Sequence, residues 1–171
     1  MLHLIRPAAL LTLALFCCTG CGSNSNAPNS QAPTAAGAAY VLKAEPTGAQ
    51  GIKLAREAAK DNDQIVVVGR IGGSPNPWVD GQAAFTLVDM EMKPCAESEG
   101  CPTPWDYCCE VDLLPKAMVM VKLVDPKGKT VTQNAKTLLG VKESQTLVVR
   151  GLAKRDEMGN LSILADGVFV K

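Results

Sequence analysis

Four cysteines in the middle of the chain are the residues whose chemistry is easiest to define. They lie in the run KPCAESEGCPTPWDYCCE, at Cys95, Cys101, Cys108 and Cys109. A cysteine thiol can form a disulfide, bind a soft metal ion or act as a redox centre, depending on its surroundings and on the compartment. We therefore first consider which cellular compartment the sequence predicts.

The start of the chain predicts export and a lipid anchor. Arg6 precedes an apolar run over residues 8–18, and two small residues then lead into Cys21, which is the layout of a secretory signal peptide. The run is shorter than the roughly 20 apolar residues of a spanning helix. The segment CTGC that ends at Cys21 resembles the lipobox of bacterial lipoproteins, in which the peptide is cut before the cysteine and that cysteine is acylated. Cleavage before Cys18 stays an alternative, although the glycine before Cys21 suits the cut better.

An extracytoplasmic, lipid-anchored position on a bacterial membrane favours disulfides among the four loop cysteines. Exported chains meet an oxidising compartment, and an even number of cysteines in a polar loop is typical of structural bridges. On an extended chain the adjacent Cys108 and Cys109 would point to opposite sides, so we expect each to pair with an earlier cysteine. The pairing is either nested (Cys95–Cys109 with Cys101–Cys108) or crossed (Cys95–Cys108 with Cys101–Cys109).

Metal and redox chemistry of these cysteines is the alternative. The spacing has no C-x-x-C half-site, so we expect no zinc site, no thiol redox centre and no cofactor. Four methionines nevertheless lie near the two ends of the loop, and thioether together with thiolate favours Cu(I). Soft-metal handling would then involve the cysteines with Met90, Met92, Met118 and Met120.

Composition excludes several classes of function. The only histidine, His3, leaves with the signal peptide, which removes Ser-His-Asp and Cys-His catalysis and any site that needs imidazole. No spacing of carboxylates suggests a glycosidase pair, so we predict that the protein is not an enzyme. Residues 1–20 contain Arg6 as their one charged side chain, so the mature chain keeps 16 basic and 17 acidic residues. This balance gives no reason to expect a nucleic-acid partner.

The remaining sequence predicts a tether and one folded domain. Residues 1–20 are the signal peptide, and residues 21–39 are a disordered tether, because they contain no charged and no large apolar side chain. Residues 40–171 form the domain, which begins with a helix ending near Lys60. Alternating or β-branched runs then predict five strands, over residues 64–71, 83–89, 117–124, 146–151 and 161–170.

Five strands with glycine-bearing bends favour a small closed barrel. The order of the segments VVVGR, AFTLVD, VMVKLVD and LVVRGLAKRDEMGNLSILADGVFV resembles the bacterial periplasmic OB-fold (BOF-like) proteins and the wider group of OB-like barrels, over about Glu45 to Val170. The resemblance implies an all-β fold: a five-stranded OB-like β-barrel with a short N-terminal helix and the cysteine-rich loop, residues 90–116, between strands two and three. From alternation, we expect these residues to face inward: Val66, Val68, Phe85, Leu87, Val119, Val121, Val148 and Ile163.

The candidate ligand-binding residues are the aromatic side chains Trp78, Trp105 and Tyr107, together with Arg70. In OB barrels the loop after strand one flanks the usual ligand face, and exposed indoles can stack on sugars or bases. We favour the interpretation that Trp78 and Trp105 close the barrel mouth and anchor their loops. Exposure of these rings in one groove would favour a tethered module that binds envelope proteins or glycans. Their burial would favour a structural or accessory envelope protein without a small ligand.

Overall fold

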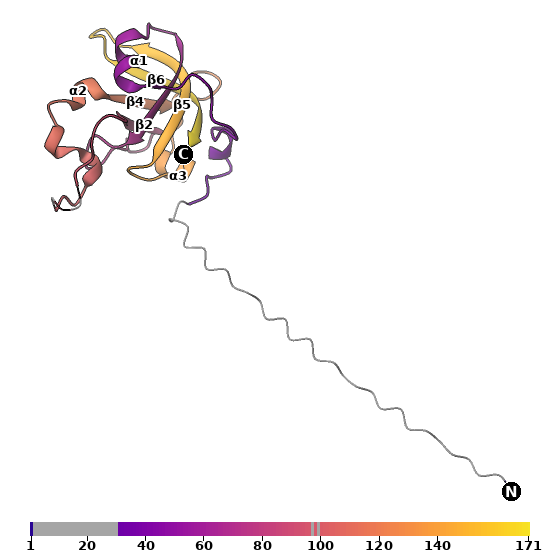
Figure 1. The fold of residues 1–171 in the computed structure, drawn as a ribbon. Helices are drawn as coiled ribbons and strands as arrows, with labels where there is room; N and C mark the ends of the chain where they lie inside the picture. Colours follow the sequence, from indigo (N-terminus) through magenta and orange to yellow (C-terminus); the bar gives the residue numbers. More distant parts are fainter. Residues whose placement is uncertain (2–30, 97, 99) are drawn as a thin grey trace.

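The domain is a closed barrel with a short helix at each end (Figure 1). The computed structural model describes Met1 and residues 31–96, 98 and 100–171. The predictions on the signal peptide and on Cys18 and Cys21 therefore lie outside the described residues. Among the described residues, no helix has the length and apolar character needed to span a bilayer.

Five strands form the barrel wall: β2 (Gln64–Ile71), β3 (Ala84–Asp89), β4 (Met118–Leu123), β5 (Thr146–Arg155) and β6 (Leu161–Val170). The strands pair in the order β2–β3–β4–β6–β5, and β5 pairs back with β2. The β4–β6 pair is parallel and the other four pairs are antiparallel. This closed order confirms the prediction of an all-β, OB-like barrel, and its bounds lie close to those read from the sequence. A two-residue strand, β1 (Gln50–Gly51), extends the sheet beside β2.

The barrel interior is filled mainly by aliphatic side chains, and most of the expected inward residues are there. Buried core positions include Phe85, Leu87, Val119, Val121 and Ile163. The prediction was wrong for β2, where Ile65, Val67 and Ile71 face the core, whereas Val66 and Val68 are only partly buried. In β5, Val148 is fully buried but lies outside the core cluster, which takes Leu147 and Val149 instead.

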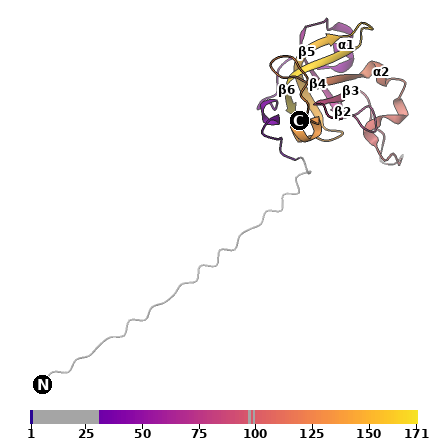
Figure 2. The same ribbon diagram turned by 180° about the vertical axis from the view of Figure 1, so that it is seen from behind.

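Helices close both ends of the barrel. The helix α1 (Ile52–Ala58) contributes Ile52 and Ala55 to the core, and its position is close to the helix predicted up to Lys60. The helix α3 (Ala135–Leu139) contributes Ala135, Leu138 and Leu139 at the opposite end, where Asn134 caps its first turn. Both views of the ribbon place the long loop between β3 and β4 at the side of the barrel (Figures 1 and 2).

The folded part begins earlier than the sequence indicated. Residues 34–39, assigned above to the disordered tether, lie beside α3 and include the 3-10 helix η1 (Gly37–Ala39). The backbone N–H of Thr34 donates to the Leu138 carbonyl at 3.0 Å, and Gly37 is buried against the same carbonyl. A Cβ at Gly37 would collide with it, so this contact requires a glycine.

Candidate metal centre

The loop between β3 and β4 is built from short helical turns: η3 (Pro104–Asp106), η4 (Cys108–Glu110) and α2 (Leu114–Ala117). The Asp106 carboxylate accepts hydrogen bonds from the Thr103 hydroxyl at 2.7 Å and from the Cys108 backbone N–H at 2.9 Å. These bonds hold the pKa of Asp106 below its ordinary value, the Thr103 bond contributing most. Tyr107 has left-handed backbone angles, φ 58° and ψ 37°, and reverses the chain between η3 and η4.

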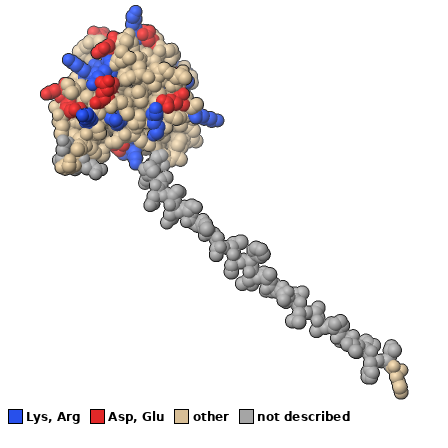
Figure 3. Space-filling model, in the orientation of Figure 1, with Lys and Arg blue, Asp and Glu red and all other residues tan. Residues whose placement is uncertain are grey.

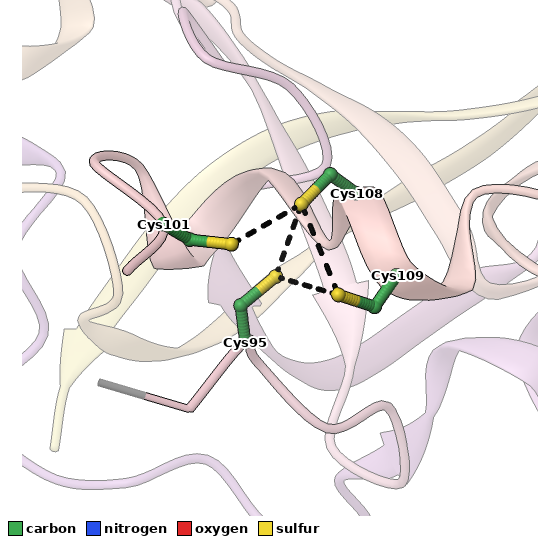
Figure 4. Close-up of side chains that lie close together, drawn as sticks. All are labelled: Cys95, Cys101, Cys108 and Cys109. Carbon is green, nitrogen blue, oxygen red and sulfur yellow. Dashed lines mark hydrogen bonds between the residues drawn. The ribbon is translucent and has the colours of Figure 1, made fainter. Parts of the chain in front are cut away.

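The turn at Tyr107 brings all four cysteines of the loop together. Figure 4 shows their side chains pointing toward a common centre. The Cys95 sulfur lies 3.4 Å from that of Cys108 and 3.7 Å from that of Cys109. The Cys108 sulfur lies 3.5 Å from that of Cys101 and 4.0 Å from that of Cys109. All four sulfurs are within 4.8 Å of one another.

These separations match a four-thiolate metal site and not a pair of disulfides. A disulfide joins its sulfurs at about 2.05 Å, and no disulfide links these cysteines in the part of the chain that the structure describes. Four sulfurs at about 2.3 Å from one tetrahedral ion are about 3.8 Å apart. Around an iron–sulfur cluster the four thiolates are shared among two or more irons, so sulfurs bound to different irons must be farther apart. The arrangement therefore fits one tetrahedral ion. The structure gives no support to the two disulfides expected from the sequence, or to the expectation that these cysteines are not metal ligands.

The thiols differ in their protonation because each sulfur contacts the others. The Cys109 backbone N–H donates to the Cys95 sulfur, which lowers the pKa of Cys95. Contact with Cys108 raises the pKa of Cys101 to about 12, and contact with Cys95 raises the pKa of Cys109 to about 12. Of these three cysteines, Cys95 is therefore the one that loses its proton most readily. A divalent ion supplies the positive charge that several thiolates require.

A second apolar cluster attaches this loop to the outside of the barrel. We call it the loop cluster; it consists of Val88, Met92, Tyr107, Leu114 and Ala117, with Met118 packed against it. Tyr107 is its largest member and is 1 % exposed. Burial raises the pKa of Tyr107, and a hydrogen bond with Arg70 opposes that shift. Arg70 also donates to the Met92 carbonyl at 3.0 Å, so it ties both ends of the cysteine segment to β2.

The candidate ligand-binding aromatics do not form an exposed groove. Trp78 is buried, stacks at a tilt on Phe85 and donates to the Glu143 carboxylate at 2.6 Å. Burial alone would raise the pKa of Glu143, but the hydrogen bonds from Lys136 and Trp78 bring it below the ordinary value. Trp105 is half-buried, and its Nε1 donates to the Pro75 carbonyl at 3.2 Å. These contacts are those of loop anchors, as in the interpretation that we favoured.

The methionines proposed as copper ligands are placed differently from one another. Met92 and Met118 pack in or against the loop cluster, and Met92 is 2 % exposed. Both therefore fill apolar space, which is the common role of methionine. Met90 and Met120 are partly buried. The four cysteines alone make up the candidate ligand set among the described residues.

The sequence did not reveal the four-thiolate site, because its spacing is not that of known half-sites. Comparisons with protein-family models and with curated proteins find no match to this chain. The site is therefore defined by its geometry, and its function has to be argued from that geometry.

Proposed function

We propose that this protein is a lipid-anchored, extracytoplasmic accessory protein whose OB-like barrel binds one metal ion through Cys95, Cys101, Cys108 and Cys109. The observation that carries the proposal is the separation of the sulfurs, 3.4 to 4.0 Å for the four closest pairs. A pair of disulfides would bring two pairs of sulfurs to about 2.05 Å, and a larger cluster would hold some sulfurs farther apart.

Zinc is the ion that fits this donor set best. Four thiolates in a tetrahedron are a frequent structural zinc site, and such a site has no open position for substrate. The ion would consequently stabilise the loop and would not activate water. Buried Met92 and the packed Met118 argue against the copper alternative, in which thioethers would join the thiolates.

The envelope location rests on the leader sequence and on the charge of the domain. The segment ending at Cys21 supports acylation, and the likeness to periplasmic OB-fold proteins is compatible with export. Figure 3 shows basic and acidic side chains intermixed over the face of the domain that it presents. That face offers no basic track for nucleic acid, which is compatible with a role among envelope proteins or glycans.

Metal binding is tested by cobalt titration of protein purified from the envelope, reduced, and freed of metal under argon. We expect one Co²⁺ per chain, with thiolate charge-transfer bands and the intense visible bands of a tetrahedral ion, and displacement by Zn²⁺. Replacing a residue that only hydrogen-bonds a metal ligand typically weakens a site by 10–100-fold, so loss of a ligand in Cys101→Ser should weaken it by at least about 100-fold. Ser substitution of exposed Val111, in the same loop, is the matched control.

Three results would contradict the proposal. Intact mass showing two disulfides in freshly isolated protein, nested or crossed, would restore the covalent interpretation. Stoichiometric Cu⁺ that zinc does not displace would assign the site to copper handling. Cobalt bands that persist in Cys101→Ser and also in Cys108→Ser would show that the four thiols are not the ligands.

Acylation is tested separately by metabolic labelling with a fatty-acid probe. We expect the label on the wild type and its loss in Cys21→Ala, with Cys18→Ala as the matched control that keeps it. Label retained by Cys21→Ala and lost by Cys18→Ala would move the anchor to Cys18. A single acyl chain anchors weakly, so stable attachment requires a second chain.

A further inference from the structure

The strand β3 is buried on both of its faces. Phe85 and Leu87 point into the barrel, while Thr86 and Val88 on the other face are 8 % and 0 % exposed. A strand in an antiparallel barrel ordinarily has one face in water. Here the cysteine loop covers the outer face at Val88, and the Thr86 hydroxyl donates to the Gly72 carbonyl of the β2–β3 loop. Val88 pairs with Met118 of β4, so the covered surface lies between the second and third barrel strands, β3 and β4, where OB folds commonly bind their ligands.

The cysteine loop approaches the backbone of the β2–β3 loop more closely than side chains would normally permit. The Gly73 backbone N–H donates to the Trp105 carbonyl at 2.8 Å. A Cβ at Gly72 would collide with that carbonyl and would lie 3.1 Å from the Tyr107 ring. The phenol ring of Tyr107 is thus held against a backbone segment that has no side chain.

The metal ligands flank this contact on both sides along the chain. Cys95 follows buried Met92 by three residues, and Cys108 directly follows Tyr107. Apart from the loop cluster, the described residues 93–96, 98 and 100–113 bury little apolar surface: Val111 and Leu113 are 59 % and 52 % exposed. A polar segment of this length has too little burial to offset the entropy of ordering it, so it needs a cross-link.

We propose that the metal ion acts as a latch: while bound, it holds residues 100–113 with Tyr107 seated over the outer face of β3 at Val88, and its loss uncovers that face. This inference rests on the proposed function, since it requires an ion at the four cysteines. The uncovered surface consists of Val88, Met118 and the Gly72–Gly73 backbone. Its occupant in the metal-bound protein is the Tyr107 ring of the same chain.

The test is amide hydrogen exchange on the full-length reduced protein, with zinc bound and after zinc is stripped by a chelator. We expect at least a 10-fold faster exchange at Gly73 and Glu110, whose N–H groups donate to the Trp105 and Tyr107 carbonyls. The amide of Val67, inside the β2–β5 ladder, should keep its protection. Re-addition of Zn²⁺ should restore the slow exchange, and Mg²⁺ should not.

Two variants separate the effect of the metal ion from a general effect of substitution in the loop. At a zinc concentration that just saturates the wild type, Cys101→Ser should exchange like the stripped wild type, and Val111→Ser should exchange like the zinc-bound protein. Protein that takes up no cobalt or zinc would refute the proposed function and the latch together. Protein that binds and releases zinc while Gly73 and Glu110 stay protected would leave the metal site standing and refute the latch.

Discussion

Substitution of Gly72 by alanine probes the contact between the loop and the barrel without touching a cysteine. The backbone of Gly72 is not left-handed, so alanine adds one methyl group and little backbone strain. That methyl would overlap the Trp105 carbonyl, and the loop would have to move outward by roughly 1 Å to regain an ordinary contact. The movement also stretches the 2.8 Å hydrogen bond from Gly73 to Trp105.

The expected loss is about 2 kcal/mol of unfolding free energy. Overpacking typically costs 1–3 kcal/mol and a weakened hydrogen bond about 1 kcal/mol, with partial relief as the loop relaxes. For a domain of this size each kcal/mol corresponds to roughly 3–4 °C, so the melting temperature should fall by about 7 °C. Denaturant titration followed by tryptophan fluorescence gives the free energy, and calorimetry gives the temperature.

The matched control is Gly81→Ala in the same β2–β3 loop. Gly81 has φ 69°, and nothing lies within 4 Å of the place that an alanine methyl would take, so its substitution adds only backbone strain, about 1 kcal/mol. Exchange at Gly73 should be faster in Gly72→Ala and unchanged in Gly81→Ala. A Gly72→Ala protein as stable as the wild type, with Gly73 still protected, would refute the close approach of the loop.

Three other predictions concern separate parts of the domain. Trp78→Phe keeps an aromatic ring but loses the indole N–H that donates to Glu143 and leaves buried space unfilled, so denaturant titration should show the free energy of unfolding lowered by at least about 1–2 kcal/mol. Gly37→Ala should expose residues 34–39 to limited proteolysis while the barrel stays intact, because the methyl collides with the Leu138 carbonyl. The third prediction concerns Asp61, whose pKa is lowered by hydrogen bonds, chiefly the one from the Lys154 side chain. Its stabilising effect is thus present at neutral pH, begins to fall near pH 3.8 and is lost as the pH passes below the lowered folded-state pKa, where the melting temperatures of the wild type and Asp61→Asn should converge.

The positions of the strands could be predicted from the sequence, but which side chains of β2 face the core could not. Alternation in AFTLVD and VMVKL fixes which side chains enter the core, and these assignments were correct. The run Ile65 to Val68 is apolar throughout, so it contains no alternation from which to choose a face. The choice is made by tertiary contact: Gly69 faces Ile52 of α1, and a Cβ there would clash. Ile65, Val67 and Ile71 share that face.

The cysteines were found from the sequence, and their arrangement was not. The disulfide prediction assumed that Cys108 and Cys109 lie on an extended chain, where their side chains diverge. In the structure they lie in a helical turn, so their sulfurs are 4.0 Å apart. The turn depends on the left-handed conformation of Tyr107, which is uncommon outside glycine and asparagine and has no signature in the sequence.

The docking of residues 34–39 on α3 limits how far the domain can travel from the bilayer. With the anchor proposed at Cys21, thirteen peptide steps separate the acylated residue from Thr34. At about 3.5 Å per residue, no conformation of that segment can place the α3 end of the barrel more than about 45 Å from the membrane surface. A partner in the same membrane is therefore confined with this domain to a layer about 45 Å deep, so the same number of molecules meets more often there than in the open compartment.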